Sequence, residues 1–207
     1  MNKKSLWNDT ALWRACTVVA MVLAFSACGG GGGDAAPAGN TAAQTASPAS
    51  ATGLIVLDAS TSCDIAGFKD STLQQINAAR AEARNCGTLG MPVFMPAAPA
   101  LAWNDILFSA AARHGRDMAQ QNYFAHTSLD GRTPDQRVSA EGYVWQAIGE
   151  NLAAGYTSID SVIAGWLSSP GHCRNLMDPV FADVAVSCVQ QAGTTFGTYW
   201  TMELGKQ

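Results

Sequence analysis

The sequence contains few charged residues, few histidines and no long apolar run. Charged residues make up 14% of the 207 positions, and no stripe of basic side chains occurs. Nucleic-acid-binding proteins normally carry such a stripe, so this class of function is excluded. The apolar segment at residues 15–25 is shorter than the about 20 residues that a membrane-spanning helix needs. Only three histidines are present, which confines imidazole chemistry to a few positions.

Several motifs that would identify a catalytic or metal site are also missing. No CxxC pair occurs, which argues against a zinc site made of four cysteines. Neither HxxxH nor HExxH occurs, so any metal ligands must converge through the fold. A hydrolytic trio of Ser169, His172 and Glu150 is conceivable from the inventory. It lacks the G-x-S-x-G elbow, and we consider it a weak hypothesis.

Residues 1–27 have the composition of a bacterial export signal. Basic residues at the start precede the short apolar segment, and small residues then lead to Cys28, as in a signal peptide. This junction resembles a lipobox, which predicts that Cys28 is lipidated; ordinary signal cleavage is the alternative. Residues 28–53 are rich in Gly, Ala, Pro and Thr and are predicted to form a flexible tether. Gly29 after Cys28 favours the outer over the inner membrane, so we expect a lipoprotein of the cell envelope.

Removal of residues 1–27 changes the formal charge from −4 to about −6. Apart from the lipid itself, nothing in this acidic domain predicts attraction to an anionic membrane. An even number of cysteines remains beyond Cys28, which in an exported chain predicts two disulfides. These residues are Cys63, Cys86, Cys173 and Cys188. Three connectivities are possible, and we predict the sequence neighbours, Cys63–Cys86 and Cys173–Cys188.

Residues 54–207 are long enough for one domain with its own core. Periodicity and capping signals predict helices at 71–85, 104–121 and 133–142 and another starting near 158. Residues 91–100 are proline-rich and are expected to be extended. Strands are predicted at 182–189 and about 195–204. Helices followed by adjacent strands indicate an α+β layered domain.

His114 shares the apolar face of its helix with Leu107 and Met118, so a core position is expected.

Three titratable residues stand out among turn-forming neighbours: His126, Glu150 and His172. Imidazole and carboxylate groups bind divalent metals and transfer protons near neutral pH. Each residue also has a purely structural explanation: His126 can fix a turn, and Glu150 can cap a segment or remain buried. His172 beside Cys173 resembles a nucleophilic dyad, but we expect Cys173 to be oxidised.

A set of motifs in a fixed order resembles the CAP superfamily, also called the SCP domain, which includes cysteine-rich secretory proteins, antigen 5 and pathogenesis-related 1 proteins. The motifs are AARHGRDM (111–118), YFAHTSLDG (123–131), GEN (149–151), WLSSPGHCRN (166–175), FADVAV (181–186) and YW (199–200). The resemblance implies an α-β-α sandwich with a central antiparallel sheet. It also implies a cleft in which His126, Glu150 and His172 match the histidines and one glutamate. Ser169 occupies the position where many members have a second glutamate.

The resemblance further implies a divalent cation such as zinc at His126, Glu150 and His172. Our leading hypothesis is an exported, lipid-anchored CAP-domain protein that binds a metal, a small molecule or a lipid in this cleft. Its expected partners are the membrane, through the N-terminal lipid, and a lipid or cell-envelope ligand, and we lean against catalysis. The alternative is a metal-dependent hydrolase of peptide or cell-wall material, with Glu150 as base. A purely structural envelope module is a third possibility.

Overall fold

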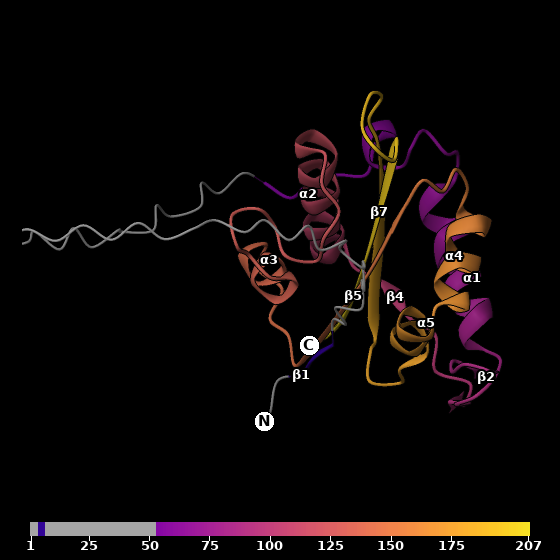
Figure 1. Ribbon diagram of the computed structural model, residues 1–207. Coiled ribbons are helices and arrows are strands. Elements are labelled where there is room, and N and C mark those ends of the chain that lie inside the picture. Colours follow the sequence, from indigo (N-terminus) through magenta and orange to yellow (C-terminus); the bar gives the residue numbers. More distant parts are fainter. Residues whose placement is uncertain (1–3, 7–52) are drawn as a thin grey trace, which may run out of the picture. The chain divides into compact units, whose positions relative to one another are not determined.

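The computed structural model describes residues 4–6 and 53–207 (Figure 1). The apolar part of the predicted signal, the predicted lipid site Cys28 and the predicted tether up to residue 52 lie outside the described residues. Among the helices of the described part, none combines the length and the apolar content needed to cross a bilayer.

A mixed sheet of five strands runs through the centre of the domain in the order β1-β5-β7-β6-β4. The strands are β1 (Lys4–Leu6), β4 (Ala102–Trp103), β5 (Ala147–Ala154), β6 (Asp183–Gln190) and β7 (Thr198–Lys206). The central strands β5, β7 and β6 are antiparallel, whereas β1 joins β5 and β4 joins β6 in parallel. Strand β1 lies within the predicted signal peptide, so cleavage before Cys28 would remove it and leave a sheet of four strands. A separate antiparallel pair is formed by β2 (Arg84–Asn85) and β3 (Phe94–Met95).

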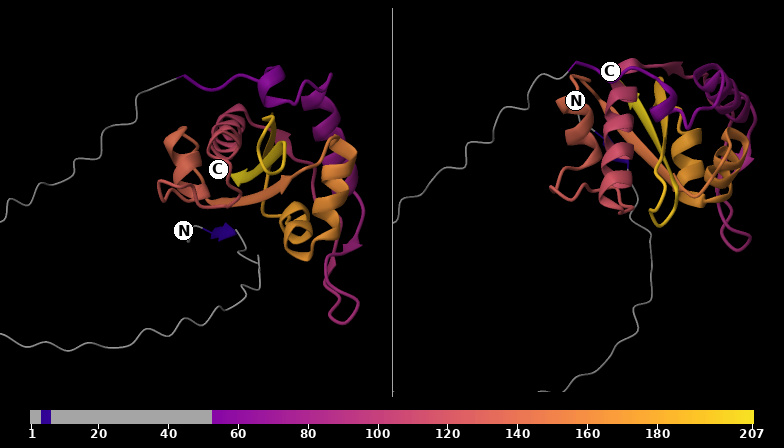
Figure 2. Two further views of the ribbon diagram at one scale, coloured as in Figure 1. Left: turned by 45° about the horizontal axis from the view of Figure 1, so that its top comes forward. Right: turned by 90° about the horizontal axis from the view of Figure 1, so that it is seen from above.

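Helices cover both faces of this sheet (Figures 1 and 2). One face is covered by α1 (Phe68–Arg80), α4 (Ile159–Ser168) and α5 (Pro170–Met177). The other is covered by α2 (Asp105–Gln121) and α3 (Pro134–Ala140), and a short turn of 3-10 helix, η1 (Ala59–Thr61), contacts β6. The α+β sandwich expected from the sequence is therefore confirmed. The antiparallel description holds for the three central strands, while the outer strands are parallel.

The sheet separates two cores because side chains alternate along each strand. Val186, Trp200 and Met202 face α1, α4 and α5 and belong to the larger core. Ile148 and Ala185 face α2 and α3 and belong to the smaller one. The aromatic residues Trp166, Tyr199 and Trp200 are all buried.

Local signals predicted some helix ends and missed others. Asn104 caps α2 as expected, because its Oδ1 accepts hydrogen bonds from the backbone N–H groups of Ile106 and Leu107. Helix α1 instead starts at Phe68, after Gly67 in a left-handed conformation (φ 62°), and ends at Arg80. The prediction of residues 71–85 was therefore wrong at both ends, since residues beyond Arg80 lead into β2. Helix α5 and strand β5 were not predicted.

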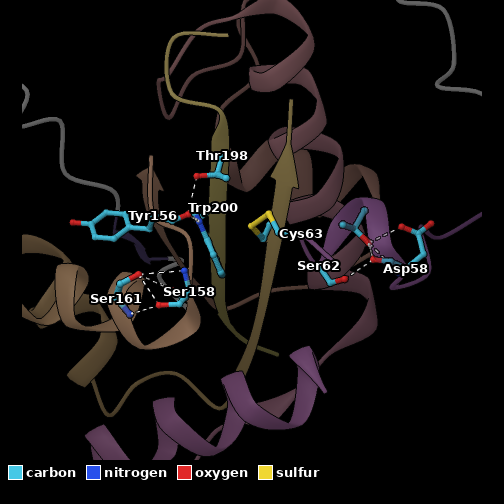
Figure 3. The surroundings of a disulfide bond; sticks show 10 residues. Asp58, Ser62, Cys63, Tyr156, Ser158, Ser161, Thr198 and Trp200 are labelled. Carbon is cyan, nitrogen blue, oxygen red and sulfur yellow. Dashed lines mark hydrogen bonds between the residues drawn. A yellow bond between two sulfur atoms is a disulfide. The ribbon is translucent and has the colours of Figure 1, made fainter. Parts of the chain in front are cut away.

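The disulfides join Cys63 to Cys188 and Cys86 to Cys173, with Cα–Cα distances of 5.2 and 5.3 Å. The prediction that sequence neighbours pair was wrong. Helix α1 lies between Cys63 and Cys86, and its 13 residues span about 20 Å at 1.5 Å per residue, far beyond disulfide reach. Figure 3 shows Cys63 directly after the capped turn of Asp58 and Ser62. The first bond links the segment after η1 to β6, and the second links the β2–β3 hairpin to α5.

Candidate functional site

Glu150 lies in the middle of β5, on the face that packs against α2 and α3. Its neighbours are turn-forming residue types, but residues 147–154 form a strand that is paired along its full length with β7. The segment AIGENLAA has few β-branched residues, so the pairing with β7, rather than local propensity, makes it a strand. The position leaves the Glu150 side chain with no solvent exposure.

Both carboxylate oxygens of Glu150 have partners. Nδ1 of His126 lies 2.7 Å from Oε1, and Nη2 of Arg137 donates to Oε2 at 2.5 Å. Burial alone would raise the pKa of Glu150. The charge of Arg137 and the hydrogen bond with His126 outweigh burial and hold this pKa below its ordinary value, so the carboxylate is ionised at neutral pH.

Arg137, which the sequence analysis missed, holds the site together from α3. It is 4% exposed, and its Nη1 donates to the carbonyl oxygens of His126 at 2.8 Å and Arg132 at 3.1 Å. One guanidinium thus fixes both the turn that carries His126 and the carboxylate that His126 contacts. In the sequence, the one indication that Arg137 is buried was its place beside the apolar Val138 in a short helix.

His114 supports the same turn from α2, and its expected core position is confirmed. It is 1% exposed, and its Nε2 donates to the carbonyl oxygen of Ala125 at 2.9 Å. Burial lowers the pKa of His114 to about 4, so the ring is neutral and its Nδ1 can accept from the Ser128 hydroxyl at 3.4 Å. His114 therefore fixes the backbone next to His126.

Glu203 is the second residue that the sequence analysis missed. It lies on β7 directly opposite Glu150 and is fully buried. Among the described residues, neither of its carboxyl oxygens has a hydrogen-bond partner. Burial, followed by the charge of Glu150, raises the pKa of Glu203 well above its ordinary value, which favours the protonated form. The signal in the sequence was a single acid between the apolar residues Met202 and Leu204.

His172 lies in the first turn of α5 rather than in the expected loop. Ser169 is the N-cap residue of this helix and Pro170 its first residue. Nδ2 of Asn151 donates to the carbonyl oxygen of His172 at 3.0 Å, which links α5 to the strand that carries Glu150. Burial, and then the charge of His126, lower the pKa of His172.

These contacts argue against the expected set of three metal ligands. Within residues 53–207, no group of three His, Cys, Asp or Glu side chains is arranged to hold a metal ion. The two carboxylate oxygens of Glu150 contact His126 and Arg137. Glu150 is therefore placed to support the His126 imidazole and not to bind an ion directly. A carboxylate that accepts from one ring nitrogen is the usual support for a histidine that binds metal through its other nitrogen. This arrangement assigns Glu150 to the support of His126.

A small hollow of about 30 Å³ lies beside Arg137, between α2, α3 and the 128–132 turn. Its lining includes three arginines, but nearby acids compensate them. Arg113 pairs with Glu141 at 2.6 Å, and Arg132 pairs with Asp130 at 2.6 Å. Because its positive charges are already balanced, this hollow is not an anion site.

The fold and the His–Glu pair define a small α-β-α sandwich of the CAP or SCP type. The family model described as "Cysteine-rich secretory protein family" (CAP) matches residues 73–204, and the chain belongs to this family. The chain is 30% identical over 104 residues to YkwD of Bacillus subtilis, with 50% of this chain and 38% of YkwD covered. It is 33% identical over 87 residues to the B. subtilis membrane protein YlbC, with 42% and 25% covered. The chain thus spans less than half the length of either relative.

The fold is also that of a solved extracellular protein with an SCP domain from Bacillus anthracis. The TM-score is 0.51 at 23% sequence identity, covering 70% of this chain and 43% of the other. At this identity the likeness concerns the fold alone. The family match and the fold both agree with the CAP superfamily, which the ordered motifs indicated.

Proposed function

We propose that this chain is an exported, lipid-anchored binding protein in which His126 and His172 bind a divalent cation such as zinc. The observation that supports it most is the 2.7 Å contact between Nδ1 of His126 and Oε1 of Glu150. This contact places the proton of the neutral ring on Nδ1 and the lone pair on Nε2, the tautomer that a metal ligand requires.

Export and lipidation are supported by the N-terminal sequence and by the two disulfides, which form in oxidising compartments. The extracellular location named for the B. anthracis protein agrees with export. Labelled fatty acid should be incorporated into the wild-type chain but not into Cys28→Ser. Incorporation into Cys28→Ser, or none into the wild type, would refute the anchor.

The metal site is tested by zinc titration of the purified chain in a calorimeter. The double variant His126→Ala/His172→Ala should lose binding. Glu150→Gln should weaken it by about 10- to 100-fold, because the supporting carboxylate is removed. Asp130→Asn removes an exposed carboxylate in the same turn and should bind like the wild type. Binding that survives in the double variant would show that the ligands are elsewhere.

The hydrolase alternative receives no support from Glu150. A general base needs a carboxylate oxygen directed at a water molecule, and both oxygens of Glu150 already have protein partners. Glu150 therefore acts in this proposal as a positioning residue. A lipid or cell-envelope ligand stays a prediction from the sequence.

A further inference from the structure

The β2–β3 hairpin, residues 84–95, presents a cluster of exposed apolar side chains. Leu89 is fully exposed, Phe94 is 78% and Met91 75% exposed, and Val93 is also exposed. Both views in Figure 2 show this hairpin projecting from the layered part of the domain. Isolated exposed apolar residues are common on protein surfaces, but four within six residues at a projecting tip indicate an interaction site.

The tip has a defined conformation. Oδ1 of Asn85 accepts hydrogen bonds from the backbone N–H groups of Gly87 at 2.9 Å and Val93 at 2.8 Å, and Cys86 N–H donates to the Val93 carbonyl at 2.7 Å. A Cβ at Gly87 would lie 2.1 Å from the carbonyl oxygen of Met91, so this turn requires glycine. The Cys86–Cys173 disulfide fixes its base to α5. The apolar residues are thus held in place at little further cost in entropy on binding.

Charge around the hairpin points to the kind of partner. Residues 83–104, between Glu82 and Asp105, contain no acid. Two cations lie at the base: Arg84 donates to the carbonyl oxygen of Ala79, and Arg174 to that of Cys86. Neither arginine forms an ion pair within the described part of the chain. An apolar tip above unpaired cations matches a membrane surface, which offers acyl chains and anionic head groups.

We propose that this hairpin inserts its apolar tip into the interfacial layer of an anionic lipid bilayer. The occupant is the membrane itself, and none of the apolar residues of the tip is a proposed metal ligand. The sequence alone predicted no such attraction beyond the lipid. The apolar residues of the tip are not part of the Glu150 network, although Cys86 at the base of the hairpin is bonded to Cys173, the residue after His172.

The predicted anchor would bring this surface into reach, a step that depends on the proposed lipidation of Cys28. About 25 residues separate Cys28 from the described domain, a length that spans up to about 80 Å when extended. A domain of this size is roughly 40 Å across. The domain can therefore turn its hairpin towards the membrane that holds the lipid.

The test uses the mature chain carrying Cys28→Ser, so that no acyl group contributes, and vesicles of phosphatidylcholine with phosphatidylglycerol. Co-sedimentation should show binding that increases with the anionic fraction. The double variant Leu89→Asn/Phe94→Asn should bind at least about ten-fold more weakly, because two large apolar side chains no longer leave water.

Val144→Asn/Leu129→Asn is the matched control, since it removes two exposed apolar side chains from other loops. It should bind vesicles like the parent chain. Equal vesicle binding by both double variants, or no binding by the parent, would overturn the proposal. Light scattering without lipid gives a second readout: a dimer that only the hairpin variant dissociates would assign the tip to a second copy instead. Zinc binding in the same preparations reports on the imidazole site, so the two proposals can fail separately.

Discussion

The two faces of the central sheet differ in what they bury. The face towards α1, α4 and α5 is apolar at most positions, including Val184, Trp200 and Leu204. The face towards α2 and α3 buries four polar side chains on the neighbouring strands β5, β7 and β6. They are Glu150, Ser187, Thr201 and Glu203. Gly115 permits close approach of α2 here, since a Cβ would lie 3.3 Å from the Ser187 hydroxyl.

This difference between the faces shows which of them lowers the stability of the domain. Among the described residues, the hydroxyls of Ser187 and Thr201 and both oxygens of Glu203 lack hydrogen-bond partners. Each such buried group costs free energy that a hydrocarbon would not. Glu150, by contrast, is fully satisfied, and it orients His126. The apolar face therefore stabilises the fold, whereas the polar face holds a candidate site at the expense of stability.

Arg137→Met should produce the largest effect, because it leaves the ionised Glu150 buried without its cation. We expect a loss of about 3–5 kcal/mol in the free energy of unfolding, measured by urea denaturation at pH 7. Arg132→Met is the control: its partner Asp130 is about half exposed, and such a pair contributes about 1 kcal/mol or less. Similar losses in both variants would show that the Glu150 network contributes little.

Glu203→Gln should come next, with an effect that depends on pH. An unfolded glutamate titrates near pH 4.5, whereas the pKa of folded Glu203 is well above this value. The folded state therefore retains a proton that the unfolded state loses, and stability falls by about 1.4 kcal/mol per pH unit above 4.5. This loss continues until the pH passes the folded pKa.

Glutamine has the shape of the protonated acid and no titration. The variant should match the wild type near pH 4.5 and exceed it by a margin that grows with pH until the folded pKa is passed. Urea denaturation at pH 4.5, 6, 7 and 8 measures this gap. A gap that stays constant across these values would mean that Glu203 titrates normally.

The contrast between the faces also explains what could be predicted from the sequence. Asn104 as a helix cap and His114 on a buried helix face are local patterns, and both predictions are confirmed. The pairing of Glu150 with Glu203 depends on strand register between segments about 50 residues apart, and no local pattern determines it. The disulfide partners likewise depend on how α1 crosses the domain. The ordered motifs indicated the family, but only the structure reveals the role of Arg137.

Thr201→Val tests the polar face at its smallest scale. The Thr201 hydroxyl is buried without a partner among the described residues, so a methyl group of similar volume should raise the free energy of unfolding by about 1 kcal/mol. Thr198→Val is the matched control on the same strand, since its hydroxyl donates to the carbonyl oxygen of Tyr156 at 2.8 Å (Figure 3). That variant should lose about 1 kcal/mol. Opposite signs would show that orphaned hydroxyls weaken the polar face. A loss in both variants would mean that Thr201 has a partner, such as an ordered water molecule, and that this face is better satisfied than its protein contacts indicate.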